Sequence, residues 1–205
     1  MIPVRAGRFI VLEGGEFSGK STQARMLADR LRASGREVVE TFEPGDTALG
    51  RELRRLLLEF DGPIDRFTET LLLAADRRQH VEDVILKAVN SGLDVVCDRY
   101  VPSSLVYQGE VRGVPPAFIE AVNQSVPEPD VVILLDVPDE VARARGGEPS
   151  DRIEREGDAF HREVRAAYRK LAAERGWIIV DGSRAPDQVA ESVWDGVRDL
   201  AGRPS

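Results

Sequence analysis

Apolar residues along the chain fall into two alternating patterns. One consists of short, almost continuously apolar runs such as residues 8–13, which are typical of strands covered on both faces. In the other, apolar residues recur at three- and four-residue intervals, as in residues 24–31, which is the spacing of one helix face. The apolar runs lie at residues 8–13, 37–42, 94–98, 131–136 and 177–180. Strands that alternate with helices predict a five-stranded parallel sheet with helices on both faces.

Glycine and proline punctuate the helical stretches. Gly35 follows the first stretch and Gly62-Pro63 ends another, as expected for residues that close a helix or cannot continue it. The polar, glycine-containing stretch from Arg145 to Arg155 predicts a loop. Helices are predicted near residues 24–34, 49–60, 67–89, 115–122, 139–145, 158–173 and 189–200. No repeat or linker interrupts this order, so we expect a single domain over residues 1–205.

Composition and charge narrow the class of protein. The chain of 205 residues carries a formal net charge of −8, which argues against a polynucleotide partner because proteins that coat nucleic acid usually carry a basic surplus. The single cysteine, Cys97, excludes a disulfide within the chain, and we interpret it as a small buried core residue. The sequence has neither the apolar run of a membrane span nor the pattern of a signal peptide, so we expect a cytoplasmic protein without a membrane partner.

A phosphate-binding motif directly follows the first predicted strand. Residues 14–21 match G-x-x-x-x-G-K-[ST], and a helical pattern follows them, which is the context that the motif requires. Backbone N–H groups of such a loop converge on phosphates, Lys20 can reach the β- and γ-phosphates, and the Ser21 hydroxyl can ligate Mg²⁺. The predicted ATP-binding residues here are Gly14, Gly15, Glu16, Phe17, Ser18, Gly19, Lys20, Ser21 and Thr22. The motif makes the expected fold a three-layer α/β fold of the P-loop NTPase type.

Kinases, GTPases and ATP-driven motors all use this loop. A GTPase needs a base-reading Asn-Lys-x-Asp element, and that tetrapeptide does not occur here. A small-molecule kinase needs a second pocket for an anionic acceptor and a lid that excludes water, because exposed ATP would be hydrolysed. Arginines suited to phosphate recur near predicted strand ends and helix starts, at Arg54, Arg77, Arg99, Arg143, Arg145 and Arg152. We therefore expect a kinase with a lid at about residues 143–156.

Asp98 and Arg99 directly follow the third apolar run. Ligands of parallel sheets bind at the carboxyl ends of the strands, so both side chains are expected at the binding edge. Asp98 is a candidate to hold Mg²⁺ together with Ser21, directly or through water. His80, on the long predicted helix, is interpreted as a core or surface residue without a catalytic role.

Several segments together resemble the bacterial thymidylate kinases. They run in that family's order and spacing over nearly the whole chain, and the pattern Asp-Arg-Tyr…Ser-Ser-x-x-Tyr-Gln-Gly is far more specific than the phosphate loop. The segments are residues 14–22, 43–45, 69–80, 98–109 and 151–154. The resemblance implies transfer of the ATP γ-phosphoryl group to dTMP with Mg²⁺. It also implies a homodimer, for which the helix around residues 67–89 can supply the interface.

The resemblance also implies roles for individual residues. Glu16 matches an acid that faces the acceptor sugar, Tyr107 matches a tyrosine near that sugar, and Arg54 and Arg99 match arginines that hold the acceptor phosphate. The residues that match those reading or surrounding the thymine are Arg77, Ser104, Gln108, Glu43, Pro44 and Leu73.

Lid arginines complete the implied catalytic set. Arg145 and Arg152 match lid arginines that carry catalytic positive charge when the phosphate loop has none. The loop fits that case, because its variable positions 16–18 hold no basic residue. Arg143 is expected near the adenine. The implied catalytic residues are thus Lys20, Asp98, Arg99, Arg145 and Arg152.

Three residues depart from the family pattern. Leu73 replaces a phenylalanine that stacks on the thymine, Phe42 replaces an arginine, and Asp46 replaces a glycine. Base–aromatic stacking is worth about 1–3 kcal/mol in nucleic-acid complexes, so these changes bear on the base preference. One alternative is a kinase for another or a modified pyrimidine deoxynucleoside monophosphate. A non-catalytic nucleotide-binding regulator is a further alternative, but it would leave the coexistence of Lys20, Asp98 and the lid arginines without a reason.

Overall fold

A computed structural model describes residues 7–147 and 151–201. The five strands are β1 (Phe9–Glu13), β2 (Val38–Phe42), β3 (Asp94–Asp98), β4 (Val131–Asp136) and β5 (Ile178–Asp181). They form one sheet in the order β2-β3-β1-β4-β5, in which every neighbouring pair is parallel. The predicted parallel sheet is confirmed, and each strand begins and ends within one residue of its apolar run.

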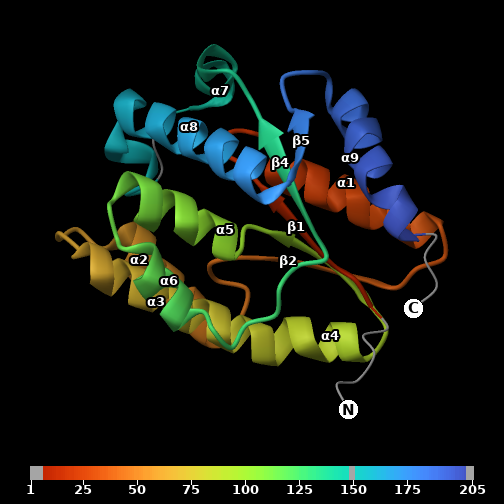
Figure 1. Ribbon diagram of the computed structural model, residues 1–205, viewed down its shortest axis with the longest axis horizontal. Coiled ribbons are helices and arrows are strands. Elements are labelled where there is room, and N and C mark those ends of the chain that lie inside the picture. Colours follow the sequence, from red (N-terminus) through yellow and green to blue (C-terminus); the bar gives the residue numbers. More distant parts are fainter. Residues whose placement is uncertain (1–6, 148–150, 202–205) are drawn as a thin grey trace.

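Helices surround this sheet (Figure 1). The α-helices are α1 (Lys20–Ala33), α2 (Ala48–Glu59), α3 (Arg66–His80), α4 (Leu86–Asn90), α5 (Val101–Ser104), α6 (Pro116–Val122), α7 (Asp139–Arg145), α8 (Asp158–Arg175) and α9 (Pro186–Ala201). The π-helical segments are η1 (Val81–Ile85) and η2 (Leu105–Val111), and η3 (Glu154–Glu156) is a 3₁₀ turn. The long helix expected at residues 67–89 is a continuous run of α3, η1 and α4. The helical run of α5 and η2 was not expected from the hydrophobic pattern.

Alternate side chains of each central strand enter different parts of the core. Ile10 and Leu12 pack with residues of α1 and α9, whereas Phe9 and Val11 pack with η1 and α4 on the opposite face. Figure 1 shows α1 and α9 lying side by side, with α4 on the other side of the strands. Cys97 of β3 is fully buried in the part of the core that contains Phe9, Val11, η1 and α4, as expected. Such two-sided burial explains why the strands read as continuous apolar runs.

The carboxyl edge of the sheet gathers the polar segments that follow each strand. In the parallel register, Leu12 of β1 and Phe42 of β2 both lie opposite Asp98 of β3. The phosphate loop after β1, the Glu43-Pro44 turn after β2 and Arg99 after β3 therefore begin side by side. Within residues 7–147 and 151–201, the helices are all too short or too polar to span a bilayer.

Candidate active site

The phosphate loop wraps around the buried ammonium group of Lys20. The Nζ atom donates to the carbonyl of Gly15 at 2.8 Å and lies 3.4 Å from the Ser18 hydroxyl. Gly14 has a φ of +152°, and a Cβ there would lie 2.7 Å from the Leu135 carbonyl, so only glycine fits. Burial and the nearby Arg99 lower the pKa of Lys20. The loop ends at the N-terminus of α1, where free backbone N–H groups favour an anion.

Ser21 and Asp98 meet at the edge of this loop. The Ser21 hydroxyl donates to Asp98 Oδ2 at 2.6 Å, which joins the start of α1 to the end of β3. The other carboxylate oxygen, Asp98 Oδ1, is buried and has no hydrogen-bond partner within the described part of the chain. An unpartnered carboxylate oxygen next to a hydroxyl, beside a phosphate loop, suits Mg²⁺, which usually takes one or two protein ligands plus phosphate and water.

The guanidinium group of Arg99 lies at the carboxyl edge of the sheet, next to the phosphate loop. The Arg99 backbone is in the left-handed region, with φ +71°, and this conformation follows directly after β3. One guanidinium nitrogen lies 2.5 Å from Glu16 Oε1, and the other donates to the Gly14 carbonyl at 3.2 Å. Burial works to raise the pKa of Glu16, but the charges of Arg99 and Lys20 outweigh it and bring the value to about 2. Glu16 is therefore a carboxylate at neutral pH.

A buried carboxyl, Glu13, holds the turn that carries Arg99. Glu13 accepts from the backbone N–H groups of Tyr100 and Ser103 at 2.9 and 3.1 Å. It also accepts from the hydroxyls of Ser103 and Tyr168 at 2.7 and 2.8 Å, and both hydroxyls contact Arg99 at 3.3 Å. Glu13 was not predicted to have a role, since its position in the sequence is the end of a buried strand.

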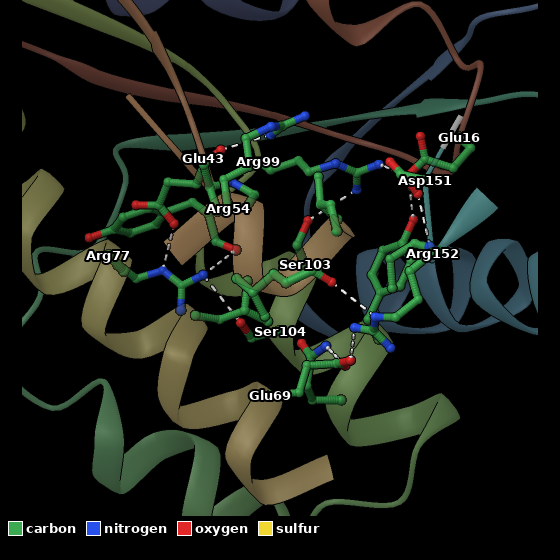
Figure 2. A pocket seen from close by; sticks show the side chains of 18 residues that line it. Glu16, Glu43, Arg54, Glu69, Arg77, Arg99, Ser103, Ser104, Asp151 and Arg152 are labelled. Carbon is green, nitrogen blue, oxygen red and sulfur yellow. Dashed lines mark hydrogen bonds and ion pairs between the residues drawn. The ribbon is translucent and has the colours of Figure 1, made fainter. Parts of the chain in front are cut away.

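A pocket next to Arg99 brings most of the predicted acceptor-binding residues together (Figure 2). Its walls come from the phosphate loop, the turns after β2 and β3, α2, α3, the α5–η2 run and the segment around residue 152. The predicted residues that line it are Glu16, Glu43, Pro44, Arg54, Leu73, Arg77, Arg99, Ser104, Tyr107, Gln108 and Arg152. Lining residues that were not predicted are Leu57, Leu58, Glu69, Tyr100, Ser103, Asp151 and Ile153.

Arg77 lies at the inner end of this pocket and is almost fully buried. Its Nε donates to Glu43 at 2.8 Å and its Nη1 to Asn123 at 2.8 Å. Its Nη2 donates to the Tyr100 carbonyl and to the Ser104 hydroxyl, both at 3.2 Å. These contacts hold the guanidinium in one orientation before any ligand binds, which is the arrangement that favours selective recognition.

Glu69 joins the acceptor pocket to the segment that follows α7. This buried carboxylate accepts from Gln108 at 2.8 Å and pairs with Arg112 at 2.9 Å and with Arg152. Figure 2 shows Glu69 and Arg152 pointing toward each other across the pocket. Arg152 also donates to the Leu57 carbonyl at 2.9 Å. The structure thus places Arg152 against α2 and α3, on the acceptor side of the site.

A second hollow opens at the phosphate loop and shares Glu16, Glu43, Arg54 and Arg99 with the first. Phe42 lines this second hollow and not the acceptor pocket. Two of the three departures from the family pattern lie here. The residues that line the hollow are Glu16, Phe17, Gly19, Lys20, Ser21, Thr22, Ala24, Glu40, Thr41, Phe42, Glu43, Asp46, Arg54, Asp98, Arg99 and Glu154.

The two arginines predicted on α7 are exposed and line neither hollow. Arg143 faces Asp158 at 3.9 Å across the start of α8, and Arg145 is the last residue of α7. Of the expected lid, residues 148–150 lie outside the described residues, and residues 151–156 form a turn followed by η3. The structure therefore brings Arg152 to the pocket and leaves Arg143 and Arg145 exposed on α7, outside the lining of both hollows.

Two hollows share Arg99 and Glu16, one at a phosphate loop and one lined by charged and polar side chains, and together they define a class of protein. This class is the P-loop kinases that pass a phosphoryl group between two small molecules. A sequence model of the family described as thymidylate kinase matches residues 12–193. The chain belongs to the thymidylate kinase family.

Individual relatives support this family assignment over most of the chain. A protein named thymidylate kinase from Halothermothrix orenii is 44% identical over 200 residues, which cover 94% of this chain and 97% of that protein. One of the same name from Pelotomaculum thermopropionicum is 45% identical over 188 residues, 87% of either chain. Another from Leifsonia xyli subsp. xyli is 44% identical over 196 residues, 92% of this chain and 93% of the relative.

Proposed function

We propose that the chain catalyses the transfer of the γ-phosphoryl group of ATP to dTMP, giving dTDP and ADP. The relatives that carry the name thymidylate kinase support dTMP as the acceptor. The observation that carries the proposal is the sharing of Arg99 and Glu16 by the acceptor pocket and the phosphate-loop hollow. A donor phosphate at Lys20 and an acceptor phosphate at Arg99 would face each other there, and phosphoryl transfer depends mainly on such positioning and charge neutralisation.

We assign the acceptor roles according to where each side chain lines the pocket. Arg99, with Arg54, binds the acceptor phosphate, since guanidinium groups form paired hydrogen bonds to phosphate oxygens. Glu16 and Tyr107, which are 3.3 Å apart, face the sugar. Arg77, Ser104 and Gln108 read the polar edge of the base, and Glu43, Pro44 and Leu73 form the rest of the substrate site. These roles remain predictions.

The residues proposed to bind the phosphoryl donor, ATP, lie in and next to the phosphate loop. Residues 14–22 bind the ATP phosphates, and Lys20 neutralises charge on the group being transferred. Ser21 and Asp98 would hold Mg²⁺, and the ion would supply positive charge that neutralises the phosphates. We propose one kinase domain over residues 1–205, with a lid at about residues 143–156. Arg145 and Arg152 are the proposed catalytic arginines of this lid. Arg143 is proposed to lie near the adenine. A cytoplasmic location also stays a prediction.

The proposed function is tested by measuring ADP formation from Mg-ATP with a panel of nucleoside monophosphates. The panel contains dTMP, dUMP, dCMP and 5-substituted pyrimidine deoxynucleotides. We expect dTMP to have the highest kcat/KM and ATP turnover to be nearly zero without an acceptor. An acceptor used at least about tenfold better than dTMP, equivalent to about 1.4 kcal/mol, would replace dTMP in the proposal and would direct attention to Leu73.

A homodimer is the assembly that we propose. Apolar side chains are exposed on α2, at its end and on α3, namely Leu49, Leu56, Phe60 and Leu71. Such a cluster on adjoining helices is typical of a surface that another protein covers. The cluster lies mostly on α2, so the proposed interface extends beyond the helix at residues 67–89.

A further inference from the structure

Tyr168 of α8 places a buried hydroxyl group next to the guanidinium group of Arg99. The hydroxyl oxygen lies 3.3 Å from Arg99 Nη1 and 2.8 Å from Glu13 Oε2. It also lies 2.9 Å from the hydroxyl of Ser103. Tyr168 is 1% exposed and Glu13 has no exposed surface, so solvent cannot readily replace the tyrosine hydroxyl if it is removed.

The chemistry of arginine sets the direction of these hydrogen bonds. A guanidinium group carries N–H donors and no acceptor, so the Tyr168 oxygen accepts from Arg99. The hydroxyl proton is donated to Glu13 Oε2, and the oxygen thus acts as acceptor and donor at once. Burial raises the pKa of Tyr168 well above its ordinary value, so the hydroxyl keeps this proton. A phenylalanine at this position would remove an acceptor from Arg99 and a donor from Glu13 together.

Helix α8 fixes the Tyr168 hydroxyl relative to the phosphate loop. The Tyr168 ring packs edge-on against Tyr107, with 6.2 Å between the ring centroids and 80° between the ring planes. Three residues earlier, Arg165 Nε donates to Asp139 at 2.6 Å, and a Cβ added at Gly15 would lie 3.1 Å from Arg165 Cγ. Helix α8 therefore lies directly against the loop, and its contacts hold the tyrosine in place.

Oxygen atoms from different parts of the chain surround Arg99 Nη1. The Gly14 carbonyl, at 3.2 Å, belongs to the phosphate loop, and the Ser103 hydroxyl, at 3.3 Å, belongs to α5, which follows Arg99. Tyr168 lies 69 residues further along the chain, on the helix that begins two residues after η3. It connects Arg99 to α8 but lines neither the acceptor pocket nor the phosphate-loop hollow.

We propose that Tyr168 is a positioning residue whose hydroxyl, hydrogen-bonded to Glu13, orients the Arg99 guanidinium group toward the phosphate of the acceptor. The inference rests on the proposed function in giving Arg99 the acceptor phosphate. Because Tyr168 contacts Arg99 and lines neither hollow, its hydroxyl acts on the acceptor through Arg99. Removing the hydroxyl therefore weakens the binding of a nucleoside monophosphate and leaves the binding of the matching nucleoside unchanged.

Calorimetry with two ligands tests this inference on the full-length protein. The ligand dTMP carries the phosphate and thymidine does not, so the ratio of their dissociation constants reports what the phosphate contributes. In Tyr168→Phe we expect the dissociation constant of dTMP to rise about tenfold, because a hydrogen bond to a charged group is lost. The constant for thymidine should change by less than about twofold. Equal losses for the two ligands, or an unchanged constant for dTMP, would overturn the proposal.

A double-mutant cycle with Arg99→Ala tests whether the hydroxyl acts through that residue. In a protein that already lacks the Arg99 guanidinium group, Tyr168→Phe should cost dTMP no further affinity. The coupling between the two substitutions then equals the whole effect of Tyr168→Phe, about tenfold. Additive losses would contradict the proposal, because they would give the tyrosine hydroxyl a role that is independent of Arg99.

Val164→Ala is the matched control for the packing of α8. Val164 lies one turn before Tyr168 on the same helix, has no exposed surface and belongs to the same part of the core. Loss of two methyl groups should lower the free energy of unfolding and leave the ratio of the dTMP and thymidine constants unchanged. A fall in that ratio as large as the one in Tyr168→Phe would attribute the effect to packing, and the proposed role of the hydroxyl would be wrong.

The panel of nucleoside monophosphates separates failure of the proposed function from failure of this inference. If another monophosphate is the preferred acceptor, the proposed function changes, and the comparison is made with that monophosphate and its own nucleoside. A loss confined to the phosphate-bearing ligand would still assign Tyr168 to the positioning of Arg99. A loss shared equally by both ligands would remove that assignment whichever acceptor the protein uses.

Discussion

Buried carboxyl groups in this protein have different charges because their neighbours differ. Glu16 is flanked by Arg99 and Lys20, which hold its pKa at about 2 in spite of burial. Asp76 is nearly fully buried and lies near Glu43, and these two causes raise its pKa to about 6. Carboxyl side chains thus supply a permanent anion next to the phosphate loop at Glu16 and, at Asp76, a group that changes charge near neutral pH.

Asp76→Asn is expected to stabilise the protein at high pH. The folded-state pKa of about 6 lies above the ordinary 3.8, so folding favours the protonated carboxyl, and that contribution is lost as the pH rises through 6. About two pKa units at ~1.4 kcal/mol each set a ceiling near 3 kcal/mol for the gain at pH 8. Urea unfolding should show the gain at pH 8 and almost none near pH 4. An equal effect at both pH values would show that ionisation is not its cause.

Arg145→Ala is expected to slow chemistry more than binding. The side chain lies exposed at the end of α7, so its proposed role needs both nucleotides in place. Arginines that neutralise the moving phosphoryl group are worth roughly 10³–10⁵ in rate in related systems. Single-turnover rates should fall on that order while the dTMP dissociation constant, measured by calorimetry, changes little.

Arg155→Ala is the control for this prediction, because Arg155 is an exposed arginine of the same segment with no assigned role. Its effect on rate should be small. Equal losses of rate and dTMP affinity in Arg145→Ala would contradict the role of Arg145.

Helix α3 presents three buried polar side chains on its inner face. Glu69 pairs with Arg152, Arg77 lines the acceptor pocket and pairs with Glu43, and His80 also contacts Glu43. These buried polar residues interrupt the apolar periodicity of the helix, so the sequence pattern could predict the helix but not what its inner face does. Glu69 and His80 read as ordinary polar positions because their partners lie between 37 and 83 residues away in the chain.

Glu69→Gln is expected to release the segment at residues 151–156. A neutral amide cannot pair with Arg112 and Arg152 together, whereas the buried carboxylate does. We expect kcat/KM for dTMP to fall by about tenfold or more, and ATP hydrolysis without phosphorylated product to rise because water enters. Amide hydrogen exchange of residues 151–156 should become faster.

Glu110→Gln is the matched control for Glu69→Gln, because it breaks a partly exposed pair with Lys170. Exposed pairs of that kind contribute little to stability because water and salt screen the two charges. Unchanged hydrogen exchange in Glu69→Gln would show that the carboxylate does not hold the segment.

At the scale of the element, strands were more predictable than the helices that shape the site. Each apolar run became a strand within one residue, because both faces of the sheet are covered and register leaves little freedom. The α5–η2 run escaped prediction since it begins with Val101-Pro102-Ser103-Ser104, a sequence poor in helix formers. Its conformation depends on tertiary contacts to Glu13, which no local pattern reveals.

For the whole molecule, the sheet order explains why distant residues form one site. Strands β2, β3 and β1 lie side by side, so residues 14–21, 43–46 and 98–99 meet at one edge although they are spread over 86 residues. The sequence and its family resemblance predicted most of the pocket lining. They could not predict the roles of Glu13 and Ser103 or the ion pair of Glu69 with Arg152, because these contacts are formed only when the chain packs.

Phe60→Asp is expected to shift the protein from dimer to monomer. Phe60 is 51% exposed, in the apolar cluster of α2 and α3, and a charge there would be buried without a partner in a dimer. Sedimentation at micromolar concentration should show the shift. Ile179→Asp is the control, because Ile179 is also 51% exposed but lies on β5 at the other edge of the sheet. A monomeric unmodified protein would remove the basis of the prediction.

The burial of Cys97 has a practical consequence for spectroscopy. It is the single thiol in the sequence, it has no exposed surface, and burial raises its pKa well above the ordinary value. Thiol reagents need an accessible thiolate, so the folded chain is effectively inert toward maleimides and nitroxide labels. A cysteine introduced at an exposed position such as Gly147 would be the sole labelling site. Fluorescence or spin-label reporters can thus be attached without first removing a native cysteine.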